Sequence, residues 1–214
     1  MAGHGDHAET FAVHKDLLIK HSDFFASALN SNSNWAESSE NRVMLRDDKP
    51  YVVGIFTQFL YTGKPFISKD DDVSEVDNAD QYRDREWRRL SECWVFGEKI
   101  LSSSFKDAIM DAILFKLRTG SGSPVSVHGY VYNRSAGVCG MRRLLVDLAV
   151  WKWTDDAMAT QGRSSSQAQF FVDVAVALNK IKANGLHGEP PFTKGDSCSY
   201  HDHGDSSPCY KKLF

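Results

Sequence analysis

The sequence of 214 residues has no long apolar run. No part of it approaches the roughly 20 consecutive apolar residues that a membrane-spanning helix needs. The start of the chain, MAGHGDHAET, also lacks the basic and apolar regions of a secretory signal. We therefore expect a soluble, intracellular protein, cytoplasmic or nuclear, with no membrane partner.

An excess of positive charge is lacking as well. The chain has 25 Lys and Arg against 28 Asp and Glu, which gives a net charge of −3. Binding to phosphate backbones needs clustered basic side chains. We therefore expect no nucleic-acid partner.

Cysteine is scarce, with four residues in the chain. Since no secretory context is present, reduced thiols are the expected state. Cys93 and Cys139 lie in apolar helical patterns, where a buried thiol behaves as a small apolar side chain.

Enzyme motifs are missing too: the HExxH zinc pair, the GxSxG nucleophile turn and the phosphate-binding loop. Histidine is a common catalytic base, but His14 stands at an expected junction of strand and helix, where a structural role is the better interpretation. His4 and His7, on a polar tail, are expected to be solvated. The acidic run Asp70–Asp72 lacks the glycine and the closing glutamate of a calcium loop. We predict a protein that is not an enzyme.

What the sequence does contain is an ordered series of short elements between Phe11 and Gly63. Apolar alternation predicts strands at Phe11–Val13 and Val43–Leu45. Helical periodicity from Asp16 to Leu29 predicts one helix, and a second helix is expected from Pro50 to its terminator Gly63. The stripes place Phe24 and Phe59 in one core.

This stretch resembles the BTB/POZ domain in its fungal form. The shared pattern is a Phe-x-Val-His-Lys strand end, a Leu-rich helix with Ser-x-Phe-Phe, a Val-x-Leu strand and a helix ending in Leu-Tyr-Thr-Gly. The residues that carry it are Phe11, Val13, His14, Lys15, Leu17, Leu18, Ser22, Phe24, Phe25, Val43, Leu45, Leu60, Tyr61, Thr62 and Gly63. The resemblance implies an α+β fold, a helical cluster with a small β-sheet, that serves as a protein-interaction module without catalytic residues.

We expect the chain to divide into three parts. Residues 1–118 form the BTB/POZ-like domain, although its usual first strand has no counterpart in Met1–Thr10. Residues 124–184 form an all-helical extension packed on this domain, and residues 185–214 form a tail with Cys and His. The Gly/Ser/Pro stretch Thr119–Pro124 is the expected linker.

Periodicity predicts the helices of the second half. They are expected at Trp87–Leu101, Phe105–Leu117, Ser123–Tyr132, Gly140–Trp153 and Phe171–Ile181. For Ser123–Tyr132 a strand stays an alternative, because three valines alternate there. Polar loops are expected at Ile67–Arg85 and Gln161–Gln167.

The tail holds the one group that could bind a metal: Cys198, His201, His203 and Cys209. Two thiols and two imidazoles make up the ligand set of structural zinc. The spacing Cys-x2-His-x-His-x5-Cys matches no established finger, although the segment resembles one that recurs at the C-termini of fungal BTB/POZ proteins. A metal knuckle, a Cys198–Cys209 disulfide and an unliganded docking segment all remain open.

Two function classes follow. The first is an interaction protein, either an adaptor for a cullin-based ubiquitin ligase or a scaffold for transcriptional regulators. A homodimer is implied by the resemblance, but without the first strand we expect weak or no dimerisation and an exposed sheet edge near Phe11–Val13. The second is a zinc-binding protein or a zinc-dependent hydrolase, in which His201, His203 and one cysteine bind the metal and Asp202 or Asp205 acts as the base.

Overall fold

The computed structural model describes residues 1–29, 42–67, 79–120, 122–164, 168–185, 188–203 and 208–214. The chain divides into two compact units. The first comprises Met1–Lys69, Glu92–Ile109 and His203–Phe214, and the second comprises Asp70–Ser91 and Met110–Asp202. The predicted boundaries at 118, 124 and 185 follow sequence order and stay predictions.

Short helices make up the first unit. They are η1 (Gly5–His7), α1 (Lys15–His21), α2 (Asp23–Ala28), α4 (Pro50–Thr62) and η5 (Tyr210–Lys212). Helices α5 (Ala79–Lys99) and α6 (Ser103–Thr119) are shared between the two units, since the division falls within each of them.

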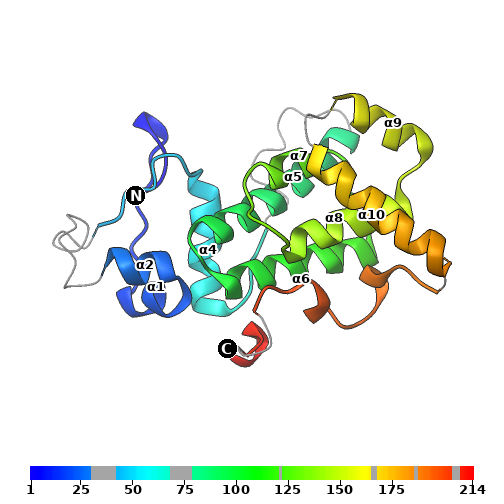
Figure 1. Cartoon of the computed structure of the whole chain (residues 1–214). Helices are drawn as coiled ribbons and strands as arrows, with labels where there is room; N and C mark the ends of the chain where they lie inside the picture. The colour runs from blue at the N-terminus through cyan, green and yellow to red at the C-terminus, as the bar shows by residue number, and fades with distance from the viewer. Residues whose placement is uncertain (30–41, 68–78, 121, 165–167, 186–187, 204–207) are drawn as a thin grey trace. The chain divides into compact units, whose positions relative to one another are not determined.

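The second unit is helical as well. Its further elements are α7 (His128–Tyr132), α8 (Gly140–Lys152), α9 (Asp155–Ser164), α10 (Ala168–Asn184), η3 (Pro191–Thr193) and η4 (Cys198–Tyr200). Helices α7, α8 and α10 pack against one another, and η3 and η4 contact α8 (Figure 1). No helix in the described ranges is long and apolar enough to cross a membrane.

The predicted small β-sheet is not confirmed. Within the described residues, β pairing is limited to two isolated bridges, from Ala2 to Glu9 and from Ala2 to Leu45. A strand exists only where a neighbour takes up its backbone bonds. Among the residues described, the backbone of Met1–Gly3 bonds to Glu9 and Leu45, and not to Phe11–Val13. The expected strand at Phe11–Val13 is therefore not formed, while Ala2 is fully buried and His4 and His7 are exposed as expected.

The single helix predicted from Asp16 to Leu29 is broken at Ser22, which separates α1 from α2. Ser22 has an extended backbone, with φ −153° and ψ 119°, and its Oγ accepts a hydrogen bond from the Phe25 amide. Serine competes well for backbone donors at such a position, so it caps a new helix. The break turns Phe25 inward, where it is buried, and leaves Phe24 half-buried.

Helix α4 confirms its prediction at both ends. Pro50 is its first residue, and Gly63 ends it with φ 69°. Since a residue with a Cβ rarely adopts this left-handed conformation, glycine is the expected terminator. The helix buries Val52, Phe56, Phe59 and Leu60.

Aromatic side chains form the core of the first unit. The Phe25 and Phe56 rings are stacked with centroids 6.1 Å apart, and Phe105 lies edge-on to Phe56 at 5.1 Å. Phe59 is 0% exposed and packs on Phe105 at 5.3 Å. Such ring pairs add about 0.5–1.5 kcal/mol each to the free energy of area burial.

Two helices were not fully predicted. Helix α5 begins at Ala79, within the expected loop Ile67–Arg85. The stretch has few apolar residues, so no periodicity marked it, but it contains good helix formers. The acidic run Asp70–Asp72 lies outside the described residues. Helix α9 overlaps the expected linker Gln161–Gln167, and its start at Thr154 carries a cap signal: the Thr154 hydroxyl accepts from the Ala157 amide at 3.2 Å.

The remaining predictions of the second half hold more closely. Helices α6, α8 and α10 lie where the periodicity placed them. In the stretch Ser123–Tyr132 a helix forms, as predicted over the strand alternative, but it covers His128–Tyr132 alone. Cys93 and Cys139 are both buried thiols.

Candidate interaction module and metal centre

The resemblance residues connect helices α1 and α4 by polar contacts. The His14 backbone N–H donates to the Tyr61 hydroxyl at 3.2 Å, and the His14 ring Nδ1 lies 2.7 Å from the same oxygen. Tyr61 of the Leu-Tyr-Thr-Gly motif thus contacts His14, the residue that precedes α1. This geometry agrees with a structural role for His14.

Ser22 connects α2 to the end of α5. Its hydroxyl donates to the Ile100 carbonyl at 2.5 Å, and the Asp23 amide donates to the Leu101 carbonyl at 3.4 Å. Leu101 has φ 53°, a conformation that is rare for a residue with a Cβ. The turn between α5 and α6 is therefore held in its shape by the start of α2.

The four tail residues predicted as metal ligands, Cys198, His201, His203 and Cys209, are a group that could hold a metal ion. A tetrahedral zinc ion holds thiolate and imidazole ligands about 3.3 to 3.8 Å apart. Cys198 and Cys209 are both thiols in the structure, so the disulfide alternative is not formed.

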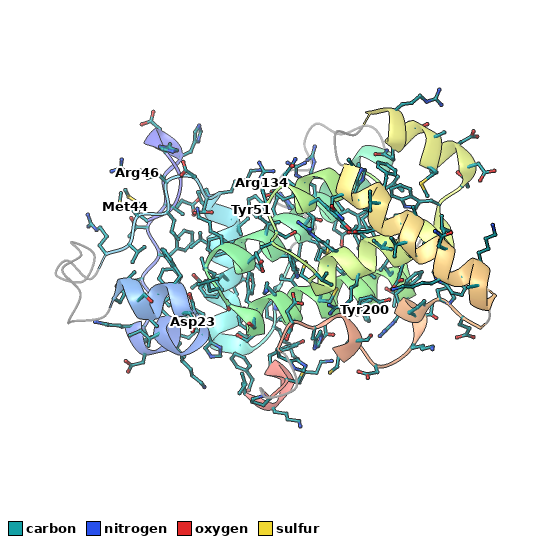
Figure 2. All side chains as sticks on the ribbon, in the orientation of Figure 1. Asp23, Met44, Arg46, Tyr51, Arg134 and Tyr200 are labelled. Atoms are coloured by element: carbon teal, nitrogen blue, oxygen red, sulfur yellow. The ribbon has the colours of Figure 1, made fainter. Side chains whose placement is uncertain are left out.

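Polar contacts to α8 hold the backbone of Ser199, Tyr200 and His201. The Tyr200 hydroxyl donates to Asp147 Oδ2 at 2.6 Å, and Tyr200 itself is 3% exposed (Figure 2). The Arg143 guanidinium donates to the carbonyls of Ser199 and His201 at 3.2 and 3.3 Å. Burial raises the pKa of the Tyr200 hydroxyl, and the bond to Asp147 raises it further. Burial also raises the pKa of Asp147, while the bonds from Tyr200 and the charge of Arg143 oppose that shift.

Asp202 is turned toward the first residue of α8. Its Oδ1 accepts a hydrogen bond from the Gly140 amide at 2.8 Å and lies 3.9 Å from the Arg143 guanidinium. A carboxylate at this place meets one of the unbonded amides at a helix start and the positive end of the helix dipole. Asp202 therefore binds the start of α8.

His201 has a carboxylate partner of its own. Its Nε2 lies 3.0 Å from Asp111 Oδ1 on α6, and the imidazole side chain is 0% exposed. Asp111 comes 90 positions earlier in the chain.

Comparison with known families concerns the first part of the chain. Residues 4–89 match the family model described as the BTB/POZ domain. The chain contains a BTB/POZ domain. No curated protein and no solved structure matches the chain significantly.

BTB/POZ domains are protein–protein interaction modules and are generally non-enzymatic. In this one, an apolar groove of about 380 Å³ lies where the small sheet was expected. Among its lining residues are Phe11, Val13, Val43, Leu45 and Phe56. The side chains of both predicted strands therefore face a common space, although the strands themselves are not formed.

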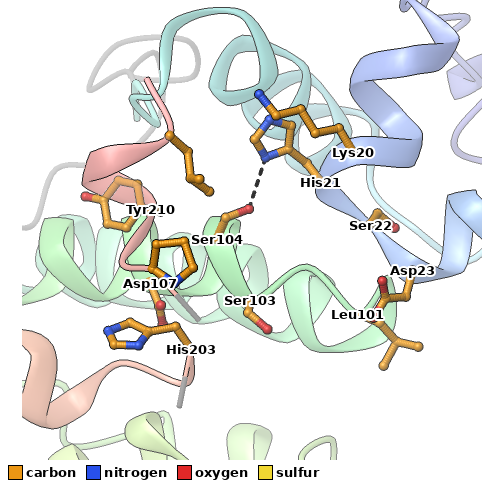
Figure 3. A pocket seen from close by; sticks show the side chains of 12 residues that line it. Lys20, His21, Ser22, Asp23, Leu101, Ser103, Ser104, Asp107, His203 and Tyr210 are labelled. Atoms are coloured by element: carbon orange, nitrogen blue, oxygen red, sulfur yellow. Dashed lines mark hydrogen bonds between the residues drawn. The ribbon is translucent and has the colours of Figure 1, made fainter. Parts of the chain in front are cut away.

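A second, more polar cavity of about 310 Å³ lies between α1, the start of α6 and the C-terminal segment (Figure 3). His21 Nδ1 lies 3.3 Å from Ser104 Oγ in its wall, with Tyr210 and His203 among the residues across from it. Burial lowers the pKa of His21, and the charge of Lys20 adds to the effect. His21 is therefore held in its neutral form near pH 7.

The sequence interpretation missed the residues that position the tail, namely Asp111, Gly140, Arg143 and Asp147. Asp111 offered a weak signal, since it is a carboxylate within the apolar run AIMDAILF of a helix. The other three look like ordinary residues of an amphipathic helix, and their role depends on which segment packs there.

Proposed function

We propose that the chain is a non-enzymatic interaction protein, in which the BTB/POZ domain binds a protein partner as an adaptor or scaffold. The match over residues 4–89 is the observation that carries this proposal. Large apolar side chains available for a partner include Ile19, Tyr61 and Phe66, which is 56% exposed. Exposed aromatic residues are frequent anchors of protein interfaces.

The adaptor role and the scaffold role differ in the protein that the chain binds directly. An adaptor binds a cullin scaffold directly, whereas a scaffold of transcriptional regulators binds a corepressor or chromatin protein. Titration of the purified full chain with a purified cullin scaffold, followed by calorimetry, decides between them. Binding in the micromolar range or tighter supports the adaptor, and no heat at tens of micromolar contradicts it.

A charged substitution tests whether the BTB/POZ domain carries the contact. Phe66→Asp should weaken partner binding, because it places a charge among the apolar residues of this domain. Phe115→Asp is the matched control, since Phe115 is 67% exposed but lies outside residues 4–89. If Phe115→Asp weakens binding and Phe66→Asp does not, the partner binds elsewhere on the chain.

Self-association is proposed to be weak. Residues Met1–Thr10 form η1 and isolated bridges in the structure, with no strand that two copies could exchange. Sedimentation that shows a tight dimer below micromolar concentration would overturn this proposal.

A second candidate function is structural zinc binding by Cys198, His201, His203 and Cys209. These four residues are a group that could hold a metal ion, and two thiols with two imidazoles make up the ligand set of structural zinc. With all four residues bound, a tetrahedral ion has no open position for a reactive water, so the number of ligands favours a structural site over a hydrolase. Thiolate and imidazole ligands favour zinc over calcium or magnesium.

Zinc stoichiometry on the purified full chain tests this candidate. We expect one equivalent in the wild type and loss of that equivalent in Cys198→Ser and in Cys209→Ser. The control is Cys93→Ala, which removes a buried thiol far from the tail in sequence and should keep the zinc. A wild type without zinc would leave the tail as an unliganded docking segment.

A further inference from the structure

The C-terminal segment, residues 208–214, packs on helices α1 and α4 within the first unit. The Phe214 ring is stacked on the His21 ring, with centroids 5.1 Å apart and an angle of 17° between the planes. It also lies edge-on to Phe59, with centroids 5.3 Å apart. Tyr210 adds a second contact with Phe59, at 6.3 Å. Two aromatic side chains of the segment therefore contact rings of the BTB/POZ domain.

Gly63, at the end of α4, leaves the space that the Phe214 ring fills. A Cβ built on Gly63 would lie 2.6 Å from Phe214 Cγ and 2.8 Å from Phe214 Cβ, which is closer than real Cβ atoms approach other atoms. Phe214 therefore packs directly on the backbone of Gly63. His21, Phe59 and Gly63 together form a site for one aromatic side chain, which we call the aromatic site.

Phe214 occupies this site at the surface and not as part of the core. Its ring is 51% exposed, whereas His21 and Phe59 are 5% and 0% exposed. A cavity of about 310 Å³ also remains beside the segment, with Tyr210 and Leu213 among its lining residues on one side and His21 on the other (Figure 3). Folded cores leave few voids of this kind, because each void removes dispersion contacts. The segment therefore packs on the domain in the manner of a bound peptide.

We infer that the aromatic site is a docking site for an aromatic side chain of a protein partner, and that Phe214 occupies it until the partner replaces it. The inference deepens the proposed interaction function and rests on it. Residues 210–214 read Tyr-Lys-Lys-Leu-Phe, so the segment itself shows the chemistry of the ligand: an apolar residue and an aromatic residue that follow two cations. Aromatic side chains that fill enclosed pockets are typical anchors of protein interfaces.

Binding of a synthetic peptide tests this site. The probe is the peptide Tyr-Lys-Lys-Leu-Phe with a fluorophore at its N-terminus, and its anisotropy is measured with the full-length wild type and with Phe214→Ala. A segment on a short tether acts at an effective concentration in the millimolar range, so a site that it fills to about nine-tenths has a Kd of about 0.1 mM for the free peptide. We expect this Kd in Phe214→Ala and about tenfold weaker binding in the wild type. Since Phe214 is half-exposed, the variant should keep its fold.

Each side of the contact has a matched control. The peptide Tyr-Lys-Lys-Leu-Ala lacks the aromatic anchor and should bind Phe214→Ala at least about tenfold more weakly. Adding Gly63→Ala to Phe214→Ala puts a methyl group into the aromatic site and should abolish peptide binding. Gly5→Ala is the control for that change, because Gly5 also has a positive φ, 55°, but a Cβ on it would meet nothing within 4 Å. Equal binding of the two peptides, or equal affinity of wild type and Phe214→Ala, would overturn the inference.

Proton resonances of the His21 ring keep the test decisive if the Gly63 variant does not fold. The ring current of Phe214, stacked 5.1 Å away, should shift these resonances upfield in the wild type. The shift should be lost in Phe214→Ala and restored by saturating Tyr-Lys-Lys-Leu-Phe. Peptide binding that leaves the His21 resonances unchanged would place the peptide elsewhere and overturn the inference.

The remaining outcomes separate this site from other occupants and from the adaptor role. A wild-type dimer in sedimentation that Phe214→Ala abolishes would mean that the segment of a second copy fills the site, and would overturn the assignment to a partner. No heat in the cullin titration contradicts the adaptor role, while peptide binding to Phe214→Ala still supports the site. Cullin binding together with no binding of the peptide to Phe214→Ala at about 1 mM overturns the site alone.

Discussion

The aromatic core of the first unit and the tail segment Ser197–Asp202 are stabilised by different means. In the core, rings such as Phe56, Phe59 and Phe105 pack on one another, and each has several apolar neighbours. The tail segment is also buried at Tyr200 and His201, but there the Tyr200 hydroxyl and the His201 ring each contact one particular carboxylate, Asp147 and Asp111.

This difference predicts how each region responds to change. An apolar core loses stability in proportion to the volume removed and keeps its architecture. When a segment is held by a few hydrogen bonds, removal of one of them leaves its partner buried and unpaired. The segment then loses its ordered position. The substitutions below are ordered from the largest expected effect to the smallest.

Phe59→Ala removes a ring that is 0% exposed from the centre of the core. We expect the free energy of unfolding to fall by about 3–5 kcal/mol in urea denaturation. Phe24→Ala is the comparison, since this half-buried ring should cost clearly less than Phe59, contrary to the equal placement that the stripe pattern predicts. Equal losses for the two variants would show that Phe24 belongs to the core after all.

Gly140→Ala tests how the tail packs against the start of α8. A Cβ built on Gly140 would lie 1.7 Å from the Tyr200 carbonyl oxygen, so the backbone of one segment has to move. We expect a cost of about 1–3 kcal/mol and faster proteolysis of the tail. Gly162→Ala, whose Cβ would meet its nearest atoms at 3.9 Å, is the control and should leave the cleavage rate unchanged. An unchanged rate in Gly140→Ala would mean that the tail does not pack there.

Tyr200→Phe removes one hydroxyl and leaves Asp147 without its donor. The expected cost is about 1–2 kcal/mol, measured by denaturation of the zinc-free protein. Tyr51→Phe is the counterpart in the first unit, where the Tyr51 hydroxyl donates to Glu92 and Lys49 also binds this carboxylate at 2.9 Å. Since Glu92 keeps Lys49, Tyr51→Phe should cost less. The reverse order would contradict the view that the tail depends on single contacts.

The smallest effect concerns pH and the core of the second unit. His128 stacks on Phe170 at 4.5 Å, and burial lowers its pKa, while a bond to the Val125 carbonyl opposes the shift. With the folded-state pKa below the unfolded value of 6.5, the stabilisation is complete above pH 6.5 and is lost as the pH falls through the folded-state pKa.

The stability of chelator-treated protein should therefore drop between pH 7.5 and pH 5.5, and by less in His128→Phe. Part of the drop should remain in that variant, because burial lowers the pKa of His21 in the same direction. Identical pH profiles for wild type and variant would show that His128 does not titrate with unfolding.

Most helices of the fold could be predicted, because the buried face of a helix appears in the sequence as apolar residues at regular spacing. Pro50 and Gly63 predicted the ends of α4 correctly, because proline and glycine act through their own backbone geometry. The break at Ser22 could not be predicted from periodicity, because Leu17, His21 and Phe24 continue one stripe across it. What decides the break is the Ile100 carbonyl, which binds the Ser22 hydroxyl from 78 positions away.

For the candidate metal centre, the residue types by themselves determined the ligand set, since two thiols and two imidazoles close together suit few ions other than zinc. Only the tertiary structure decided what surrounds that set: Asp111 at the His201 ring, Asp147 at Tyr200 and the α8 start at Asp202. The physical reason is the range of the interactions. Periodicity, caps and ligand chemistry act over a few neighbouring residues, whereas a buried hydrogen bond joins whichever distant groups the packing of helices brings within 3 Å.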